Sequence, residues 1–398
     1  MEEDKGYYEG MEKMKKITAV MLSILAAGFL TCSSQMTACR VQAASDDNTA
    51  SLDAAQATSA EVADDALKDR IAQMSIEEKA AQLFFVRCPK KDALSEEQKY
   101  QFGGYIFFAS DFKDQTPQSI RQQIASLQAA ADIPMLMGVD EEGGTVNRIS
   151  KYQAFRSQPF ASPRTLYAAG GLAQVQADTT EKCTFLLNLG INVNFAPVCD
   201  VSQKPGSFMY ARSLGQNADV TAEYVRSVVQ VMKEQKVGST LKHFPGYGEN
   251  ADTHTGIATD NRSLASFRQS DFLPFQAGIQ AGADMVLVSH NIVTCMDADK
   301  PASLSPQVHQ ILRQELGFQG VIITDDLVME AVQQYTGEEG AAVDAVLAGN
   351  DMLCCTNYQT QLPAVIAAMK SGEISEAQVD ASLLRILKWK RQLGLLTK

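Results

Sequence analysis

Short apolar runs alternate along this chain with longer segments in which apolar residues recur at helical spacing. The runs with the length and bounding residues of buried strands are Leu83–Arg87, Gly104–Phe108, Met135–Val139, Asn192–Ala196, Gly238–Leu241, Met285–Ser289, Val321–Thr324 and Met352–Cys354. Helical spacing is found in Pro117–Ala131, Ala218–Gln235, Leu264–Ala281, Ala341–Leu347 and Glu376–Leu393. Because parallel neighbours need crossover connections, this alternation predicts a parallel α/β sheet, and a count of eight strands favours a closed barrel.

Two helix starts have specific signals. Ser75 and Glu78 have the spacing of a capping box, in which each side chain accepts a hydrogen bond from the backbone amide of the other residue. Ser375 is placed to cap the last helix. No G-x-G-x-x-G string follows a strand, which disfavours a dinucleotide-binding domain.

The first part of the chain has the pattern of an export signal. Lys15 and Lys16 precede the apolar stretch Ile17–Leu30, whose 14 residues are too few to cross a membrane comfortably. Small residues before Ala44 suit a signal peptidase, so we expect residues 1–43 to be a signal segment. Met14 is an alternative start of translation.

The choice between release and anchoring stays open. Met36–Cys39 weakly resembles a lipobox, so a lipid on Cys39 and a retained membrane anchor remain alternatives to simple secretion. Residues 44–65 lack aromatic residues and any strand pattern, and they are expected to form a flexible linker. We expect a single catalytic barrel over residues 66–398.

Net charge and cysteine spacing limit the kinds of ligand that the protein is expected to bind. The formal net charge of −12 disfavours binding to nucleic-acid backbones, and the composition, 45% hydrophobic and 21% charged, is that of a soluble globular protein. The six cysteines after residue 43 lack metal-ligand spacing, so we expect no metal and no cofactor. Whether any of these thiols are bridged is left open, and a monomer is expected.

Titratable residues gather at the carboxyl ends of the predicted strands. That end is where barrels of parallel strands build active sites, so five such strand ends predict an enzyme. The residues are Asp140, Asp200, Lys242 with His243, His290 and Asp325.

The residue types at these strand ends suit glycoside hydrolysis. A carboxylate such as Asp325 can attack an anomeric carbon while a second group protonates the departing oxygen. Asp252 and His254 lie two residues apart in a glycine-flanked loop, where the carboxylate can orient the imidazole.

With these residues in place, the chain resembles the β-N-acetylglucosaminidase branch of glycoside hydrolase family 3. The matching strings are Met74–Lys79, Gly138–Gly144, Asn194–Val201, Arg212–Gly215, Lys242–Gly246 with Asp252–His254, Pro301–Ser305, Gly320–Leu327 and Ala348–Met352. The resemblance implies a single TIM-like (β/α)8 barrel and a retaining mechanism through a covalent glycosyl-enzyme. It also implies a substrate with a terminal N-acetylglucosamine, often linked to a muramic-acid sugar of peptidoglycan.

The resemblance also implies roles for individual residues. Asp325 matches the nucleophile, and His254 with Asp252 matches the acid/base dyad. The positions that match sugar-binding residues are Asp140, Arg148, Arg212, Lys242 and His243.

Three positions depart from the family pattern: Thr145 stands in place of an arginine, Tyr247 in place of a more common histidine, and Thr253 in place of a serine. These changes bear on the preference for the leaving group rather than on the chemistry. Three other readings stay open: a β-glucosidase or β-xylosidase, a glycoside phosphorylase, and a sugar-binding wall protein without activity.

Overall fold

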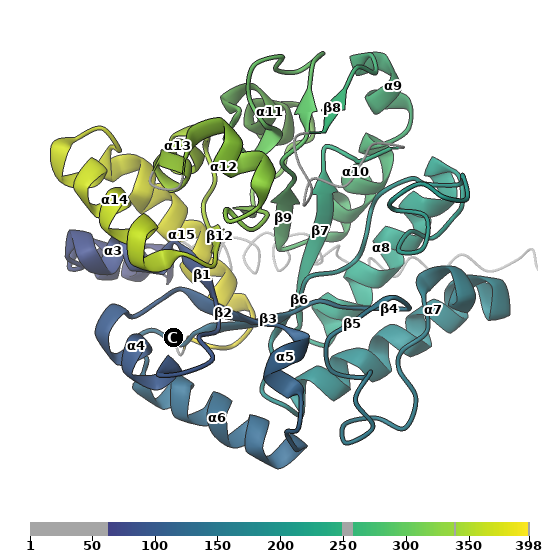
Figure 1. The fold of residues 1–398 in the computed structure, drawn as a ribbon, viewed down its shortest axis with the longest axis horizontal. Helices are drawn as coiled ribbons and strands as arrows, with labels where there is room; N and C mark the ends of the chain where they lie inside the picture. The colour runs from purple at the N-terminus through teal and green to yellow at the C-terminus, as the bar shows by residue number, and fades with distance from the viewer. Residues whose placement is uncertain (1–62, 249–257, 338–339, 397–398) are drawn as a thin grey trace, which may run out of the picture. The chain divides into compact units, whose positions relative to one another are not determined.

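Eight parallel strands form the centre of the computed structural model, which describes residues 63–248, 258–337 and 340–396 (Figure 1). In chain order they are β1 (Phe84–Arg87), β2 (Gly104–Phe107), β3 (Leu136–Val139), β6 (Val193–Asn194), β7 (Gly238–Phe244), β9 (Met285–Val288), β11 (Val321–Thr324) and β12 (Leu353–Cys355). From β1 to β11 each strand pairs in parallel with the next one in this list, and β12 pairs in parallel with β1.

The ring of strands closes between β11 and β12. The amide of Met352 donates to the carbonyl of Ile322 at 3.0 Å, and Ile323 and Met352 form a parallel bridge. The closed α/β barrel predicted from the sequence is therefore confirmed, as is the position of every predicted strand. One strand is longer than predicted: β7 continues through Lys242 and His243 to Phe244, which pairs with Val288.

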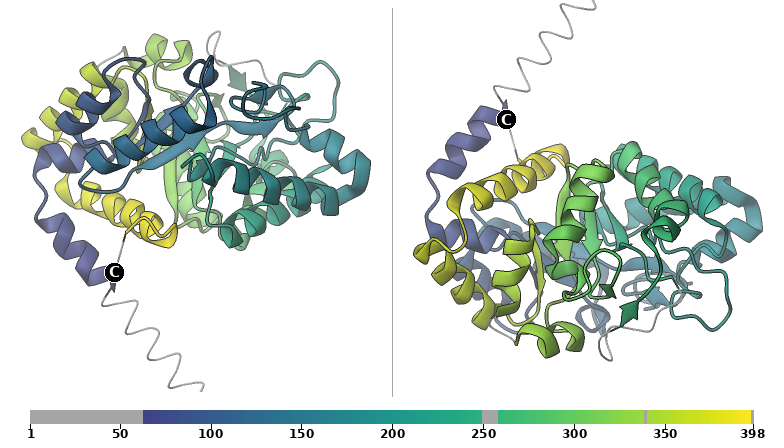
Figure 2. Two further views of the ribbon diagram at one scale, coloured as in Figure 1. Left: turned by 90° about the horizontal axis from the view of Figure 1, so that it is seen from below. Right: turned by 90° about the horizontal axis from the view of Figure 1, so that it is seen from above.

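Helices surround the strands, as the two views of Figure 2 show. A helix over residues 63–72 begins the described chain, three residues before the point at which folding was expected to start. The remaining α-helices are α3 (Ile76–Gln82), α4 (Ala93–Tyr100), α5 (Ala109–Phe112), α6 (Pro117–Ala130), α7 (Pro163–Leu187), α8 (Ala218–Glu234), α9 (Leu264–Gln269), α10 (Phe272–Ala281), α11 (Pro306–Gln310), α12 (Glu330–Thr336), α13 (Gly340–Ala348), α14 (Tyr358–Ser371) and α15 (Glu376–Gln392).

Local signals set several helix boundaries. The Ser75–Glu78 capping box is present at α3, and the Ser375 side chain accepts from the Gln378 amide at α15, so both predicted caps are confirmed. The single helix expected over Leu264–Ala281 is wrong, because Ser270 leaves the helical conformation and separates α9 from α10. Pro274 lies in the first turn of α10, where its missing N–H is not needed.

The core is packed with aromatic and aliphatic side chains. Phe85 of β1 and Phe195, just after β6, meet edge to face with ring centroids 5.3 Å apart. A Cβ at Gly138 of β3 would lie 2.7 Å from the Phe195 ring, so only glycine leaves room for both rings. The six cysteines within the described ranges are all free thiols. No helix in those ranges is long and apolar enough to cross a membrane.

Two small sheets lie outside the barrel sheet. Strands β4 (Glu141–Gly143) and β5 (Val146–Asn147) form an antiparallel hairpin directly after β3. Strands β8 (Thr259–Asp260) and β10 (Ile292–Val293) pair in parallel. Because these strands follow barrel strands in the sequence, they continue the chain beyond the carboxyl ends of the barrel.

Candidate active site

The predicted site residues lie at the carboxyl ends of neighbouring barrel strands. Asp140 follows β3, and Asp200 lies in the segment after β6. Lys242 and His243 are near the end of β7, and Asp325 follows β11. Since these strands are neighbours in the order β11-β9-β7-β6-β3, the structure brings the five residues to one side of the barrel rim.

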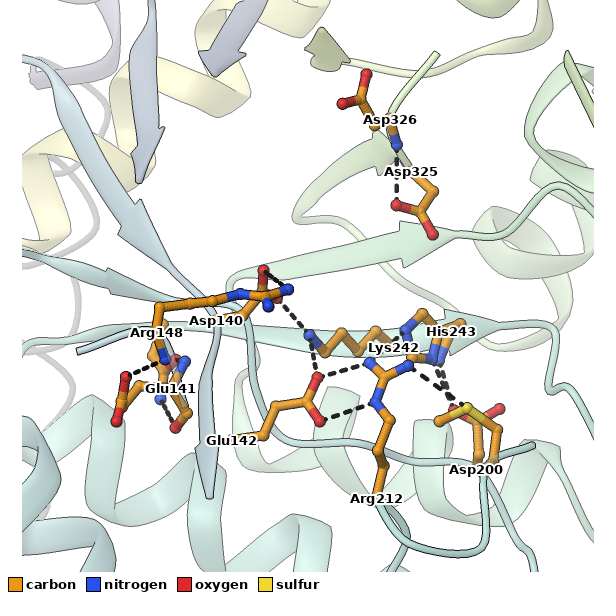
Figure 3. Close-up of polar contacts among 12 residues, drawn as sticks. Asp140, Glu141, Glu142, Arg148, Asp200, Arg212, Lys242, His243, Asp325 and Asp326 are labelled. Atoms are coloured by element: carbon orange, nitrogen blue, oxygen red, sulfur yellow. Dashed lines mark hydrogen bonds and ion pairs between the residues drawn. The ribbon is translucent and has the colours of Figure 1, made fainter. Parts of the chain in front are cut away.

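An ion-pair network links Asp140, which follows β3, and Glu142 of β4 to Lys242 of β7 (Figure 3). The Lys242 ammonium lies 2.7 Å from Oδ1 of Asp140 and 2.6 Å from Oε1 of Glu142. Arg212, in the segment between β6 and α8, donates from Nη2 to Oε1 of Glu142 at 2.6 Å and from Nε to Oε2 at 3.0 Å. Arg148, after the β4–β5 hairpin, lies 3.5 Å from Oδ2 of Asp140.

Glu142 lies at the centre of this network, and no role was predicted for it. Its side chain is 1% exposed and shares Oε1 between Lys242 and Arg212. Burial alone would raise the pKa of Glu142, but the charges of Arg212 and Lys242 outweigh burial and hold that pKa well below its usual range. Glu142 is therefore a charged partner of both cations.

Alternation along an extended chain explains why Glu142 joins Asp140. Residues two apart in a strand point to the same side, so Asp140 and Glu142 both face Lys242, while Glu141 faces away. Glu141 accepts from the amides of Arg148 at 2.9 Å and Ile149 at 2.8 Å, and also from the Ser150 hydroxyl. Glu141 thereby fixes the backbone that carries Arg148. The spacing of Asp140 and Glu142, two residues apart after a strand, could have indicated that both carboxylates point to the same side of the chain.

His243 is held in one tautomer by its two neighbours. Nδ1 lies 2.8 Å from Oδ2 of Asp200, and Nε2 lies 3.1 Å from Nη2 of Arg212. A guanidinium can only donate, so Nε2 accepts from Arg212 and Nδ1–H donates to Asp200. Asp200 also accepts from the amides of His243 and Tyr247, which ties the imidazole to the backbone. The Tyr247 ring packs edge-on against His243 at 5.3 Å.

Asp325 lies beyond the end of β11, and in Figure 3 its carboxylate points to the side on which Lys242 lies. Its amide donates to the carbonyl of Val288 on β9 at 3.0 Å, and its Oδ1 accepts from the amide of Asp326 at 2.9 Å. These two bonds fix the start of the segment that carries the carboxylate.

The residues next to Asp325 support this segment. Asp326 accepts from the Thr356 hydroxyl at 2.5 Å and from the Val328 amide at 3.2 Å, so its carboxylate braces the loop after β11. Nε2 of His290 donates to the carbonyl of Asp326 at 3.1 Å, and Nδ1 lies 2.7 Å from the Ser303 hydroxyl. These contacts give His290 a bracing role for the Asp325 segment.

Asp252 and His254 lie outside the described residues, between 248 and 258. The chain on both sides of them is tied together by Arg262. This guanidinium donates to both oxygens of Asp260, to Asp271 at 2.8 Å and to the carbonyl of Gly246 at 3.2 Å. Gly246 has a φ of 121°, and a Cβ there would lie 2.4 Å from Oδ1 of Asp271. Arg262 was not anticipated, because its partners come together only in the fold.

Comparisons with known proteins identify the family of the chain. The model of the Glycosyl hydrolase family 3 N terminal domain matches residues 75–389. β-Hexosaminidase A of Pseudoalteromonas piscicida is 30% identical over 324 residues, which cover 74% of this chain and 54% of that protein. A β-hexosaminidase of Xanthomonas campestris pv. campestris is 36% identical over 256 residues, covering 63% of this chain and 76% of that protein.

A solved structure agrees with the sequence comparisons. The glycoside hydrolase family 3 β-N-acetylglucosaminidase from Paenibacillus sp. str. FPU-7 matches with a TM-score of 0.76 and 30% identity, over 82% of this chain and 64% of that one. This chain thus spans about half the length of the Pseudoalteromonas relative and about two thirds of the Paenibacillus protein. The family match covers most of the sequence and includes every strand of the barrel, and the chain belongs to glycosyl hydrolase family 3.

Proposed function

We propose that this protein is a retaining exo-glycosidase that releases a terminal β-linked N-acetylglucosamine. The observation that carries the proposal is the placement of Asp325 on the same rim as the network of Asp140, Glu142, Lys242 and Arg212. A single carboxylate beside a set of charged hydrogen-bonding groups suits attack on a sugar held by its hydroxyls. The names of the β-hexosaminidase and β-N-acetylglucosaminidase relatives support the choice of sugar.

The proposed chemistry has two steps. In the first, an oxygen of Asp325 attacks the anomeric carbon, and the His254 imidazolium gives its proton to the glycosidic oxygen as that bond breaks. In the second, neutral His254 takes a proton from water, the water oxygen bonds to the anomeric carbon, and the Asp325 carboxylate leaves. Asp252 would orient His254 and stabilise its charged form.

The network around Lys242 is proposed to hold the sugar ring. A hydroxyl both donates and accepts, so a carboxylate next to an ammonium can satisfy it from both sides. Asp140 and Arg148 are suited to this because their side chains stay 14% and 31% exposed, whereas Glu142 is buried. Hydrogen bonds to charged groups of this kind contribute about 1.5–3 kcal/mol each.

The proposed natural substrates are fragments of peptidoglycan. The support for them is the export signal expected in residues 1–43, which would bring the enzyme outside the membrane, together with the family resemblance. The enzyme would encounter such fragments whether it is released as a mature protein or anchored by a lipid on Cys39.

Activity on chromogenic sugars tests the proposal directly. The purified protein is given the p-nitrophenyl β-N-acetylglucosaminide and the β-glucoside, and the anomer formed first is identified by NMR. We expect preference for the N-acetyl sugar, the β-anomer as first product, and a loss of about 10³-fold or more in kcat for Asp325→Asn.

A matched control separates chemistry from folding. Asp284 accepts from the Ser239 amide and hydroxyl near the amino end of β7, so Asp284→Asn removes a carboxylate from the opposite end of the barrel. It should keep its turnover. A preference for the glucoside would overturn the substrate assignment, and an α-anomer as first product would overturn the retaining mechanism.

A further inference from the structure

The charged side chains of the network balance one another. Among the described residues, the cations are Arg148, Arg212 and Lys242, and the carboxylates that contact their charged groups or the His243 ring are Asp140, Glu142 and Asp200. Three positive and three negative groups therefore meet there, with His243 in its neutral form. The balance at the buried end depends on Glu142, which is the shared partner of Lys242 and Arg212.

We propose that Glu142 is a positioning and specificity residue that makes this network accept a neutral sugar and reject anions. The inference rests on the proposed role of the network in sugar binding. Glu142 would act by fixing where the Lys242 and Arg212 donors point and by cancelling the excess positive charge of the pair.

Geometry supports the positioning role. Lys242 has three N–H donors, and contacts with Asp140 and Glu142 use two of them, which leaves one for a ligand. Arg212 uses Nε and Nη2 on Glu142 and His243, so its Nη1 donors remain for a ligand apart from a long 3.7 Å contact to the Met209 sulfur. Glu142 thus binds Nε and Nη2 of Arg212 and one N–H of Lys242. The Nη1 donors of Arg212 and one N–H of Lys242 remain to donate to a ligand.

Charge supports the specificity role. A lysine beside an arginine with no carboxylate between them is a common arrangement for binding phosphate or carboxylate. Here the pair is 2% and 16% exposed, where charges interact more strongly than in water. The depressed pKa of Glu142 keeps it ionised at working pH, so the pair does not present an uncompensated charge.

The test compares binding of inorganic phosphate and of N-acetylglucosamine by ligand-induced thermal shift and calorimetry, which need no turnover. In Glu142→Gln we expect phosphate to bind about tenfold tighter or more than in wild type, and N-acetylglucosamine to bind at least about tenfold more weakly. Glu142→Asp keeps the negative charge on a side chain that is one methylene shorter. It should therefore weaken the binding of N-acetylglucosamine without strengthening the binding of phosphate.

The matched control is Asp178→Asn. Asp178 is a buried carboxylate paired with Lys182 at 3.0 Å and lines the same small cavity as Glu142, but it contacts neither Lys242 nor Arg212. It should bind both ligands as wild type does. An equal gain of phosphate binding in this control would overturn the inference, because any unpaired buried lysine would then suffice.

A wild-type protein that binds phosphate as tightly as Glu142→Gln would also overturn the inference. Should Glu142→Gln not fold, Glu142→Asp carries the test of positioning, since it keeps the charge but shortens the side chain, and unchanged binding of N-acetylglucosamine there counts against the inference. Wild-type turnover of the N-acetylglucosaminide is measured in parallel. Its absence contradicts the proposed function, whereas the phosphate comparison still decides the role of Glu142.

Discussion

His243 illustrates how one side chain depends on the charges around it. Asp200 takes the Nδ1 proton and Arg212 donates to Nε2, so the ring lies between a carboxylate and a guanidinium. The same Asp200 accepts from the amides of His243 and Tyr247 with its two oxygens. The orientation of His243 in the network is therefore set by Asp200 and Arg212 together.

Replacing Asp200 with asparagine should disturb that orientation. An amide NH₂ must face either the Tyr247 amide or the donors of His243, and two donors then oppose each other. We expect Asp200→Asn to lower kcat/KM by roughly 10–100-fold, the equivalent of losing one charged hydrogen bond. Steady-state kinetics with the N-acetylglucosaminide measure it, and an unchanged kcat/KM would show that His243 needs no support from Asp200.

A buried lysine, Lys390, lies between helices at the amino end of the barrel. Lys390 of α15 is 0% exposed and donates to Oε1 of Gln82 at 2.9 Å, while Gln82 donates to the carbonyls of Gln101 and Phe102. Burial lowers the pKa of Lys390 to about 7, although nearby Glu97 on α4 opposes this shift. Burial likewise raises the pKa of Glu97 to about 8. Desolvation therefore outweighs the attraction between the two groups.

The depressed pKa of Lys390 makes the stability of the helix layer depend on pH. In the unfolded chain this lysine has a pKa near 10.5, so its stabilising contribution is complete above that pH and is lost as pH falls towards 7. Lys390→Met removes the titrating group, so the variant does not lose this stability as pH falls. We expect the unfolding free energy of the variant, relative to wild type, to rise by on the order of 3 kcal/mol between pH 10 and pH 7.

Thermal unfolding across that pH range measures the effect. The comparison of interest is the pH trend, because Lys390→Met also leaves Oε1 of Gln82 without its donor at every pH. Lys370→Met, at an exposed lysine paired with exposed Glu77, serves as the control and should show a flat trend. A flat trend for Lys390→Met as well would mean that Lys390 stays protonated in the fold, as it is in the unfolded chain.

For the whole molecule, much of the architecture could be predicted from sequence patterns. All eight barrel strands were placed because each is a short apolar run bounded by turn residues, and apolar runs are the strongest local signal. The extension of β7 through Lys242 and His243 was missed, since a charged pair ends the apolar pattern although the backbone pairing continues. The break between α9 and α10 was missed because helical spacing persists on both sides of Ser270.

The site could be predicted only in part. Asp140, Lys242, His243 and Asp325 follow from the rule that parallel strands present polar residues at their carboxyl ends. Glu142 was not predicted, because its partners Lys242 and Arg212 reach it only in the fold. Its spacing from Asp140 indicates only that both side chains point to the same side of the chain.

The central claim is that Asp325 forms a covalent bond to the sugar, and trapping that intermediate tests it most directly. The protein is incubated with the 5-fluoro-β-glycosyl fluoride of N-acetylglucosamine, digested, and its peptides are sequenced by mass spectrometry. We expect the fluorosugar on the peptide that contains Asp325, with fragments that place the label on this residue. A label on Asp326 or another residue would contradict the assignment. Turnover of the reagent with no labelled peptide, as expected if the N-acetyl group of the substrate is the nucleophile, would contradict the covalent mechanism.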